Sequence, residues 1–441
     1  MPLSADPQDE QLQLATQSLE KDSHFVKALI DAADKREVIA REDIYSSSGM
    51  KLVSGGTRLT GRFYDRLVEH KLLTPLERSL GVSNAVDATQ LFALIKAQAG
   101  GIPLLAAQFD RAESMRQLEG LFGRLKIPAA LGLKLTVTQE ERPLLFRHLL
   151  NTAIIACLLA IEDQLPGDDA RALIVAAALH DIGELSIDPA ILEEDCRTTP
   201  EERRHLYAHP LTGFLILRDF AEIPAAAKQA VLQHHEAVDG SGYPYRRRGD
   251  QLGRVARYLS VSDVAASLLV RFGADQRICM LLRLTRQKYD AQALNAIGRV
   301  FCAADAPVGV TPDLAGATIR LSQASLLFEA WDALRQRLAE WPASESAAVD
   351  YLVERVNNLR MTLADAGFDP SGFEAMPALA NGDDPGVCIE LKLVLDELER
   401  QFKALAREIE RNRYARRAQR PLAVSEIFDN WLGQVRQFAG E

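Results

Sequence analysis

The sequence lacks the features that indicate an exported, membrane-spanning or nucleic-acid-binding protein. Its five cysteines are odd in number and scattered, and no two are spaced as CxxC, which argues against a disulfide framework and against a zinc finger. The first residues hold no basic segment followed by an apolar stretch, and no run reaches the roughly 18 uncharged apolar residues of a membrane span. The net charge of -10 leaves no surplus of Lys and Arg to hold a phosphate backbone. We therefore expect a cytoplasmic protein with no membrane segment and without nucleic acid as its main partner.

The composition predicts a folded, mainly α protein. Of the 441 residues, 47% are hydrophobic and 25% charged, a balance that shows no bias toward disorder and allows roughly three domains. We predict an N-terminal helical and β-hairpin regulatory domain, a central helical bundle, and a C-terminal helical bundle or coiled-coil hairpin. Their predicted bounds are residues 1–139, 140–305 and 306–441.

The N-terminal part contains one segment typical of β structure. Between residues 36 and 60, short runs around Val38 and Leu52 are punctuated by Ser, Gly and Thr, which predicts a small β-hairpin. From Arg62 to Lys126 the apolar spacing favours amphipathic helices with short connections. Residues 1–139 contain no catalytic constellation.

The C-terminal part carries an apolar seam whose members are spaced alternately by four and three residues. The seam consists of Leu391, Leu395, Leu398, Phe402, Leu405 and Ile409. This spacing is typical of a helix that packs against another helix. Because the seam covers fewer than three heptads, two interpretations stay open, an internal bundle and a homodimer contact.

Six of the eight histidines lie between His148 and His235, and this window is where we expect the function. His148 lies in an apolar helical pattern that begins near Pro143, and taken alone it could be a core histidine. A buried-looking helix ends at the doublet His180 and Asp181, an arrangement in which the carboxylate could bridge two metals.

The second half of the window adds three more pieces. His205 and His209 stand four apart, a spacing that can chelate one ion, although an exposed helix histidine is the ordinary alternative for His205. The pair His234 and His235 is followed by a glycine-rich turn, and Asp263 is a lone acid in an apolar helical run, where an unpaired carboxylate is costly. Because each buried polar group needs a partner, one dinuclear metal site explains them together.

These residues resemble the HD-GYP family, a bacterial branch of the HD phosphohydrolases. The resemblance covers about residues 140–305 and rests on the HD doublet, HPLTG, HHE and the DGSGYP loop. It implies an all-helical HD-type bundle with two divalent metals, iron or manganese ahead of zinc, magnesium or nickel. It implies ligands at seven positions: His148, His180, Asp181, His209, His234, His235 and Asp263. One metal would be held by His148, His180, Asp181 and Asp263, and the other by Asp181, His209, His234 and His235.

The resemblance further implies hydrolysis of cyclic di-GMP or a related phosphodiester, with two ions that activate a water for attack on phosphorus. The residues expected at the reaction are His180, Asp181 and Glu184. The substrate-binding residues expected are Gly240, Ser241, Gly242, Tyr243, Pro244 and Arg248, although Tyr243 and Pro244 could instead form a rigid turn and the arginines after them a solvated loop. A signalling protein of unknown identity is the partner expected for the flanking parts.

Three departures from the family pattern bear on activity. Glu184 stands where the family has a lysine that meets the substrate phosphate, so repulsion replaces attraction. Leu144 stands where members with three metals carry a glutamate, so we expect two metals. After Asp263 the usual DxxDA pattern is incomplete. The alternative is therefore a weak or inactive relative that acts as a cyclic di-GMP sensor or protein scaffold. A third interpretation is hydrolysis of another phosphoester.

Overall fold

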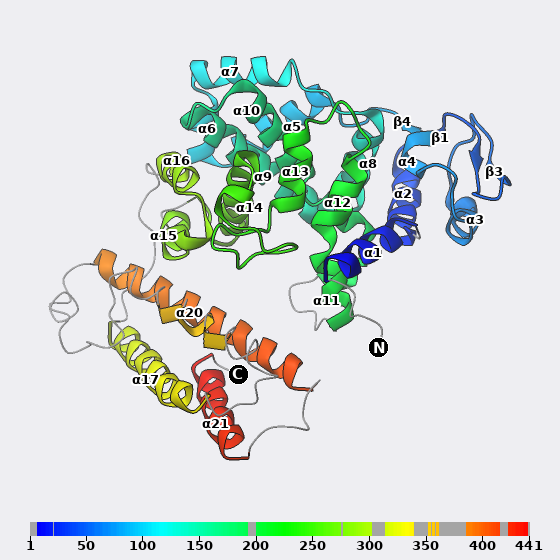
Figure 1. Cartoon of the computed structure of the whole chain (residues 1–441). Coiled ribbons are helices and arrows are strands. Elements are labelled where there is room, and N and C mark those ends of the chain that lie inside the picture. The colour runs from blue at the N-terminus through cyan, green and yellow to red at the C-terminus, as the bar shows by residue number, and fades with distance from the viewer. Residues whose placement is uncertain are drawn as a thin grey trace. The chain divides into compact units, whose positions relative to one another are not determined.

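The computed structural model describes residues 7–20, 22–192, 200–274, 277–301, 314–338, 352–353, 355–357, 359–360, 385–414 and 422–439. The chain forms two compact units, one of residues 1–278 with 286–304 and one of residues 279–285 with 305–441. Helices dominate both units and the strands are short, so the predicted mainly α fold is confirmed (Figure 1). The exact bounds of the three predicted parts stay a prediction, and the bound at 305–306 lies outside the described residues.

The first part of the chain builds a small β element and a set of helices around it. The helices are α1 (Pro7–Glu20), α2 (Ser23–Lys35), η1 (Gly61–Phe63), α3 (Tyr64–Glu69), α4 (Leu76–Ser79), α5 (Ala88–Gly100), α6 (Pro103–Phe109), α7 (Ala112–Phe122) and α8 (Ala129–Glu141). Helix α2 begins where the Asp22 carboxylate accepts a hydrogen bond from the Phe25 amide, a typical N-cap.

The predicted β-hairpin is present, with a second strand pair beside it. Strands β2 (Ile44–Tyr45) and β3 (Lys51–Val53) pair antiparallel within the predicted segment. Strand β1 (Val38–Ala40) instead pairs with β4 (Leu80–Val82), with Val38 opposite Val82. The helices expected between residues 62 and 126 are present, and the connection between α4 and α5 contains the strand Leu80–Val82, which the sequence did not predict. A three-residue strand has too short a pattern of its own and forms through its pairing with β1.

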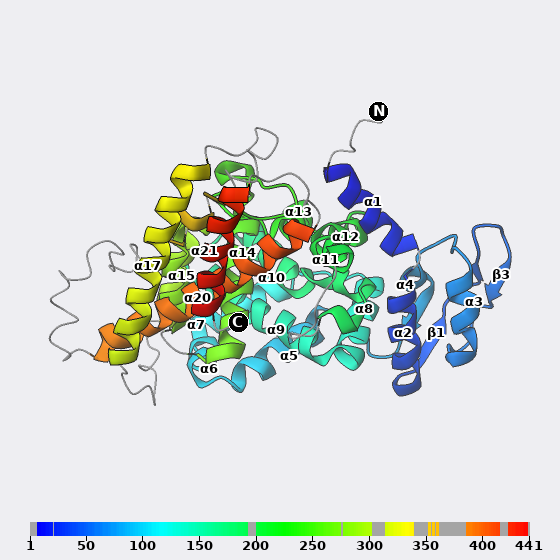
Figure 2. The same ribbon diagram turned by 90° about the horizontal axis from the view of Figure 1, so that it is seen from below.

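The central part is a bundle that carries the six clustered histidines. Its elements are α9 (Pro143–Glu162), α10 (Gly167–Leu179), η2 (Ile182–Ser186), η3 (Pro189–Leu192), α11 (Pro200–Tyr207), α12 (His209–Leu217), α13 (Ala225–Gln233), η4 (Gly249–Gln251), α14 (Arg254–Phe272), η5 (Arg286–Lys288) and α16 (Ala291–Phe301). Helix α15 (Arg277–Leu284) lies in this stretch of the sequence, but most of it belongs to the second unit. Figures 1 and 2 both show α9, α10, α13 and α14 side by side, and these four helices pack against one another. Helix α9 begins at Pro143 as predicted, since proline needs no amide partner in a first turn.

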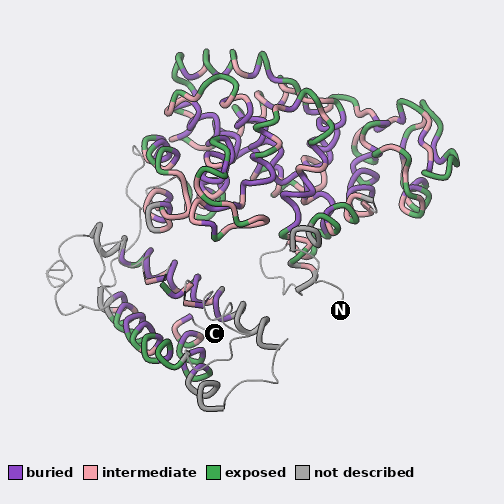
Figure 3. Tube along the Cα trace, viewed as in Figure 1, coloured by how far each residue is buried: buried purple, intermediate pink, exposed green. Residues whose placement is uncertain are grey.

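Helix α9 is the core helix of this bundle. From Leu149 to Ala160 every side chain is buried, and Figure 3 shows the centre of the first unit as mostly buried. In the described part of the chain, α9 is the one helix long and apolar enough to cross a membrane, with 72% of the apolar window buried. The run is not uncharged, because Arg147 interrupts it, so the expectation of no uncharged run of about 18 residues holds for this helix. Since the neighbouring helices cover it, α9 is explained by packing inside the protein.

The second unit packs α17 (Leu314–Leu338), α20 (Pro385–Tyr414) and α21 (Leu422–Phe438) against one another. The seam residues Leu391 to Leu405 are buried, and the Phe402 ring lies 5.7 Å from those of Phe328 and Phe438. The side chain of Ile409 lies outside the described residues. These contacts favour the internal-bundle interpretation of the seam, and a homodimer contact stays a prediction.

A buried lysine joins the N-terminal helices to the bundle. The side chain of Lys134 in α8 is 1% exposed, and its ammonium lies 3.3 Å from Glu77 Oε1 and 3.5 Å from the centre of the Phe25 ring. Asp22 lies close enough for this charge to act on it, and its second oxygen accepts a hydrogen bond of 2.8 Å from Ser186 Oγ in η2. Burial nevertheless raises the pKa of Asp22 to about 6. This ion cluster of Asp22, Glu77 and Lys134 therefore connects α2, α4 and α8 to η2.

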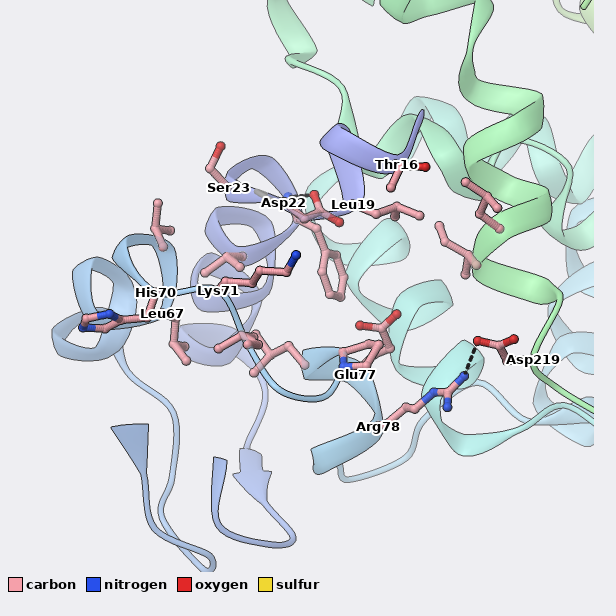
Figure 4. Close-up of a pocket in the computed structure, with 18 of the residues that line it drawn as sticks. Thr16, Leu19, Asp22, Ser23, Leu67, His70, Lys71, Glu77, Arg78 and Asp219 are labelled. Atoms are coloured by element: carbon pink, nitrogen blue, oxygen red, sulfur yellow. Dashed lines mark hydrogen bonds and ion pairs between the residues drawn. The ribbon is translucent and has the colours of Figure 1, made fainter. Parts of the chain in front are cut away.

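A cavity of about 300 Å³ lies beside this cluster and not at the histidines. It is lined by residues of α1 to α4 and by the end of α12, as Figure 4 shows. Asp22 and Glu77 line it together with Lys71, and the ion pair of Arg78 with Asp219, 3.3 Å apart, spans from α4 to the turn after α12. The charged groups that line the cavity have partners within the protein, such as Lys134 for Glu77 and Asp219 for Arg78. We therefore interpret the cavity as the contact between the N-terminal helices and α12.

We expect Lys134→Ala to lower the free energy of unfolding by about 3–5 kcal/mol, because it leaves buried carboxylates without their cation. The matched control is Lys51→Ala, since Lys51 pairs with Asp43 at 2.7 Å on the surface, where such pairs contribute under about 1 kcal/mol. Urea unfolding at neutral pH measures both. Equal losses for the two variants would contradict the importance of the buried cluster.

Candidate metal centre

The metal-binding candidates lie where helices begin and end around one point of the bundle. His148 comes from the second turn of α9 and Asp263 from the middle of α14. His180 and His234 directly follow the last residues of α10 and α13, and His209 opens α12. Five separate helices, α9, α10, α12, α13 and α14, therefore contribute to one small volume, three of them through residues at a helix end.

Close packing of η2 on α12 brings Asp181 to His209. Gly183 lies so near the start of α12 that a Cβ there would overlap the carbonyl oxygen of His209 and crowd the amide of Gly213. Only glycine permits this approach of the two backbones. The glycine that follows the HD doublet is therefore a requirement of the site's geometry.

The seven predicted ligands form two adjoining groups. One contains Asp181, His209, His234 and His235, and the other His148, His180 and Asp263. In each group the ligand atoms lie within 4.8 Å of one another. Asp181 faces both groups, because its Oδ1 lies 3.2 Å from His209 Nε2 and 3.3 Å from His234 Nε2, while its Oδ2 lies 3.0 Å from His180 Nε2. Its carboxylate therefore has the position of a bridge.

The second group closes around Asp263. Its Oδ1 lies 2.9 Å from His148 Nε2 and 3.6 Å from His180 Nε2, while its Oδ2 lies 3.8 Å from His235 Nδ1. The lone acid that the sequence placed in an apolar helix thus has imidazole partners from three other segments. His148 is consequently no isolated core histidine.

Backbone carbonyls orient three of the imidazoles. The Nδ1 atoms of His180, His209 and His234 lie 3.0, 2.7 and 2.7 Å from the carbonyl oxygens of Ala177, Leu206 and Val231. Each carbonyl lies three residues earlier in the chain and accepts the Nδ1 proton. A neutral ring then carries a lone pair at Nε2, the arrangement found in metal-binding histidines.

The arrangement of acceptors fits bound cations. With Nδ1 protonated, His209 Nε2 and His234 Nε2 are two lone-pair atoms 3.2 Å apart, and His148 and His180 Nε2 also lie 3.2 Å apart. The buried Asp181 Oδ1 has no hydrogen-bond partner among the described residues. Because acceptors repel at these distances, shared cations are the simplest way to satisfy them. The residues present therefore fit divalent metal ions.

The charges of the site point the same way. Although burial opposes ionisation, the imidazoles hold the pKa values of Asp181 and Asp263 well below their usual range. Burial likewise opposes protonation of His148, His180 and His209, and the two carboxylates still raise their pKa values. For His234 and His235 the effect of burial exceeds that of the carboxylates, so the pKa values of these two imidazoles are lowered. Two ionised acids thus lie in a water-poor site that favours positive charge.

Glu184 lies at the edge of this centre. It occupies η2, three residues after Asp181, and burial together with the Asp181 charge raises its pKa to about 7. It belongs to neither ligand group. Its carboxyl adds negative charge beside the site, which is the effect expected from its place in HDIGE.

The glycine-rich loop is fixed to the site through Glu236. This carboxylate is buried and accepts hydrogen bonds from the amides of Tyr245, at 2.7 Å, and Arg247, at 3.0 Å. A Cβ on Gly242 would overlap the backbone of His235 and Ala237, so glycine is needed where the loop folds back. The sequence prediction assigned no role to Glu236. Its position directly after two predicted ligands is the signal that could have indicated one.

The other predicted residues have different places. The Tyr243 ring stacks on the His235 imidazole, with centres 4.8 Å apart, and Pro244 continues the same loop. Gly240 contacts the side chain of Arg248, which lies on the exposed side of the loop, and the Ser241 hydroxyl donates to Asp239 Oδ1 at 2.7 Å. These contacts neither require nor exclude substrate binding, so the roles of these residues stay predictions.

The chelating pair of His205 and His209 is not formed. Helix α11 ends at Tyr207 and α12 begins at His209, so the two histidines do not share one helix, and His205 belongs to neither ligand group. The four-residue spacing was misleading because a helix boundary falls inside it.

Comparison with known proteins places the histidine-bearing part in a family. Residues 131–292 match the family described as HD domain. A cyclic di-GMP phosphodiesterase of Pseudomonas aeruginosa is 31% identical over 31% of this chain and 32% of its own length. A cyclic di-GMP phosphodiesterase of Thermotoga maritima is 44% identical over 22% of this chain and 26% of its own. A 3'3'-cGAMP-specific phosphodiesterase of Vibrio cholerae is 35% identical over 26% of this chain and 24% of its own. The chain thus spans about a third or less of these relatives' length.

We expect divalent metal in protein purified without oxygen, and we expect His209→Ala to lose at least half of it, because the three remaining ligands Asp181, His234 and His235 hold an ion less firmly than four. His205→Ala is the matched control, four residues away and outside the cluster, and should keep the wild-type metal content. Elemental analysis measures both. Unchanged metal in His209→Ala would contradict the site.

Proposed function

We propose that this chain binds two divalent cations and hydrolyses a cyclic dinucleotide, with cyclic di-GMP as the first candidate, because residues 131–292 match the family described as HD domain and relatives of this part are named cyclic di-GMP phosphodiesterases. The observation that carries the proposal is the orientation of the imidazoles, with Nδ1 bound to backbone carbonyls and Nε2 directed at Asp181. We propose iron or manganese as the metal, since imidazole and carboxylate ligands suit both. The two cations, when bound, lower the pKa of water and neutralise charge on a phosphodiester.

The position of each residue suggests whether it would hold a cation or lie over the substrate. One cation would be held by His148, His180, Asp181 and Asp263, and the other by Asp181, His209, His234 and His235. The Asp181 carboxylate would fix the distance between them, because its two oxygens face the two groups. The loop from Gly240 to Pro244 would then lie over the bound phosphodiester, held in place by Glu236.

The N- and C-terminal parts would serve regulation and assembly. A cytoplasmic location, a signalling protein as partner and a homodimer through the C-terminal helices belong to this proposal. Hydrolysis of cyclic di-GMP and of 3'3'-cGAMP should be compared directly, since relatives named for either substrate resemble this chain.

Glu184 supports one alternative function. A carboxylate beside the Asp181 bridge weakens the pull on an anionic substrate, so the chain could bind a cyclic dinucleotide and signal through partner contacts without turning it over. Wild-type turnover decides between the two functions.

We expect metal-loaded wild-type protein to convert cyclic di-GMP to a linear product, and we expect His180→Ala to reduce the rate by at least about a hundredfold, because it removes a ligand that also contacts Asp181. Chromatography of the nucleotides measures the product, with His205→Ala as the control that should keep wild-type turnover. Absence of turnover of any cyclic dinucleotide, with both metals verified in the protein, would refute the enzymatic function and favour the sensor.

We expect Glu184→Gln to lower KM for cyclic di-GMP severalfold and Glu184→Lys to lower it further, because the two variants first remove a negative charge and then add a positive one. Both are compared with wild type at pH 8, above the pKa of about 7 where Glu184 is largely ionised. The same KM in all three proteins would show that Glu184 does not face the substrate.

A further inference from the structure

Three neighbouring rings connect the metal centre with a side chain that reaches solvent. The Tyr243 ring stacks on the His235 imidazole at 4.8 Å with 29° between the planes, and the Tyr207 ring lies 4.7 Å from Tyr243, tilted by 43°. Tyr207 is 42% exposed and is the one exposed aromatic side chain in the described part of the chain. The rings of Tyr243 and Tyr207 therefore form an aromatic surface that extends from the candidate metal ligand His235 to solvent.

The chain holds this surface in place from both sides. Tyr243 is fixed through its amide, which donates to the His235 carbonyl oxygen at 3.1 Å, and through the loop that Glu236 binds. Tyr207 is the last residue of α11, and the carbonyl of its neighbour Leu206 accepts from His209 Nδ1. Both rings are thus attached to backbone that lies next to metal ligands, which places them at a fixed distance along the chain from the site.

Packing alone does not explain Tyr207. Its ring leaves two fifths of the residue surface in water, and it lies against Tyr243, which itself stacks on a candidate metal ligand. Aromatic rings at such places are the usual platforms for nucleobases, because every base has a π-face and stacking tolerates differences in base identity.

We propose that Tyr207, supported by Tyr243, forms a nucleobase subsite in which a purine stacks while the phosphate of the same nucleotide lies at the cations. The inference rests on the proposed function, since it takes phosphate binding at the metal centre as given. It goes beyond that function by assigning base recognition to a residue of α11 that lies outside both the ligand set and the DGSGYP loop. A purine covers more of a phenol ring than a pyrimidine, so purine nucleotides bind more tightly.

The test compares two ligands that share a phosphate and differ in the base. Calorimetry on the metal-loaded full chain measures binding of GMP and of ribose 5-phosphate. In wild type, GMP binds roughly tenfold more tightly than ribose 5-phosphate, the order expected for one stacked base. Tyr207→Ala removes this difference and leaves ribose 5-phosphate binding unchanged, which also shows that the variant is folded. Tyr207→Phe keeps the ring and therefore keeps the difference.

Other outcomes separate this inference from the function on which it rests. Equal binding of the two ligands by wild type, absence of binding of either, or equal weakening of both in Tyr207→Ala overturns the subsite. A preserved, Tyr207-dependent preference for GMP in a protein that hydrolyses no cyclic dinucleotide supports the subsite while refuting the enzymatic function.

Discussion

The central bundle gathers buried carboxylate oxygens and imidazole nitrogens that shared positive charge stabilises at such short distances. Asp181 contributes both carboxylate oxygens to this crowding, and the imidazoles of His180, His209 and His234 direct Nε2 at them because backbone carbonyls occupy Nδ1. Burying such a set is costly unless positive charge is shared among its members. The helices that meet here therefore enclose a cluster of cation-binding groups as well as an apolar core.

Much of this centre could be predicted from the sequence, and for identifiable reasons. A helix that starts at Pro143 and one that ends before His180 and Asp181 follow from proline, apolar periodicity and a glycine after the doublet. The meeting of seven distant ligands followed from resemblance to a family and from the cost of burying each of them alone. Periodicity places a residue on a helix, but it does not bring two helices together.

What the sequence did not predict depends on contacts between distant segments or on a single helix boundary. Strand Leu80–Val82 exists through its pairing with Val38–Ala40. A lysine in a helix is normally expected at the surface, so the sequence does not predict that Lys134 is buried. Its burial depends on the contacts with Glu77 and Phe25, which come from other helices. The break at Ala208 separates His205 from His209 and leaves Tyr207 at a helix end. Pro210 in the first turn of α12 is the sequence signal for this boundary, and the four-residue spacing of the histidines drew attention away from it.

The hydrogen bond from Ser186 to Asp22 has a consequence for how this molecule is built. One carboxylate starts α2, shares the field of a buried ammonium and fastens the short helix that carries the HD doublet's neighbours. The Asp22 carboxylate therefore joins the first turn of α2 directly to η2, the short helix whose N-cap is Asp181. A change at Asp22 acts on both elements at once, so the opening helices help to set the position of the segment that follows the HD doublet.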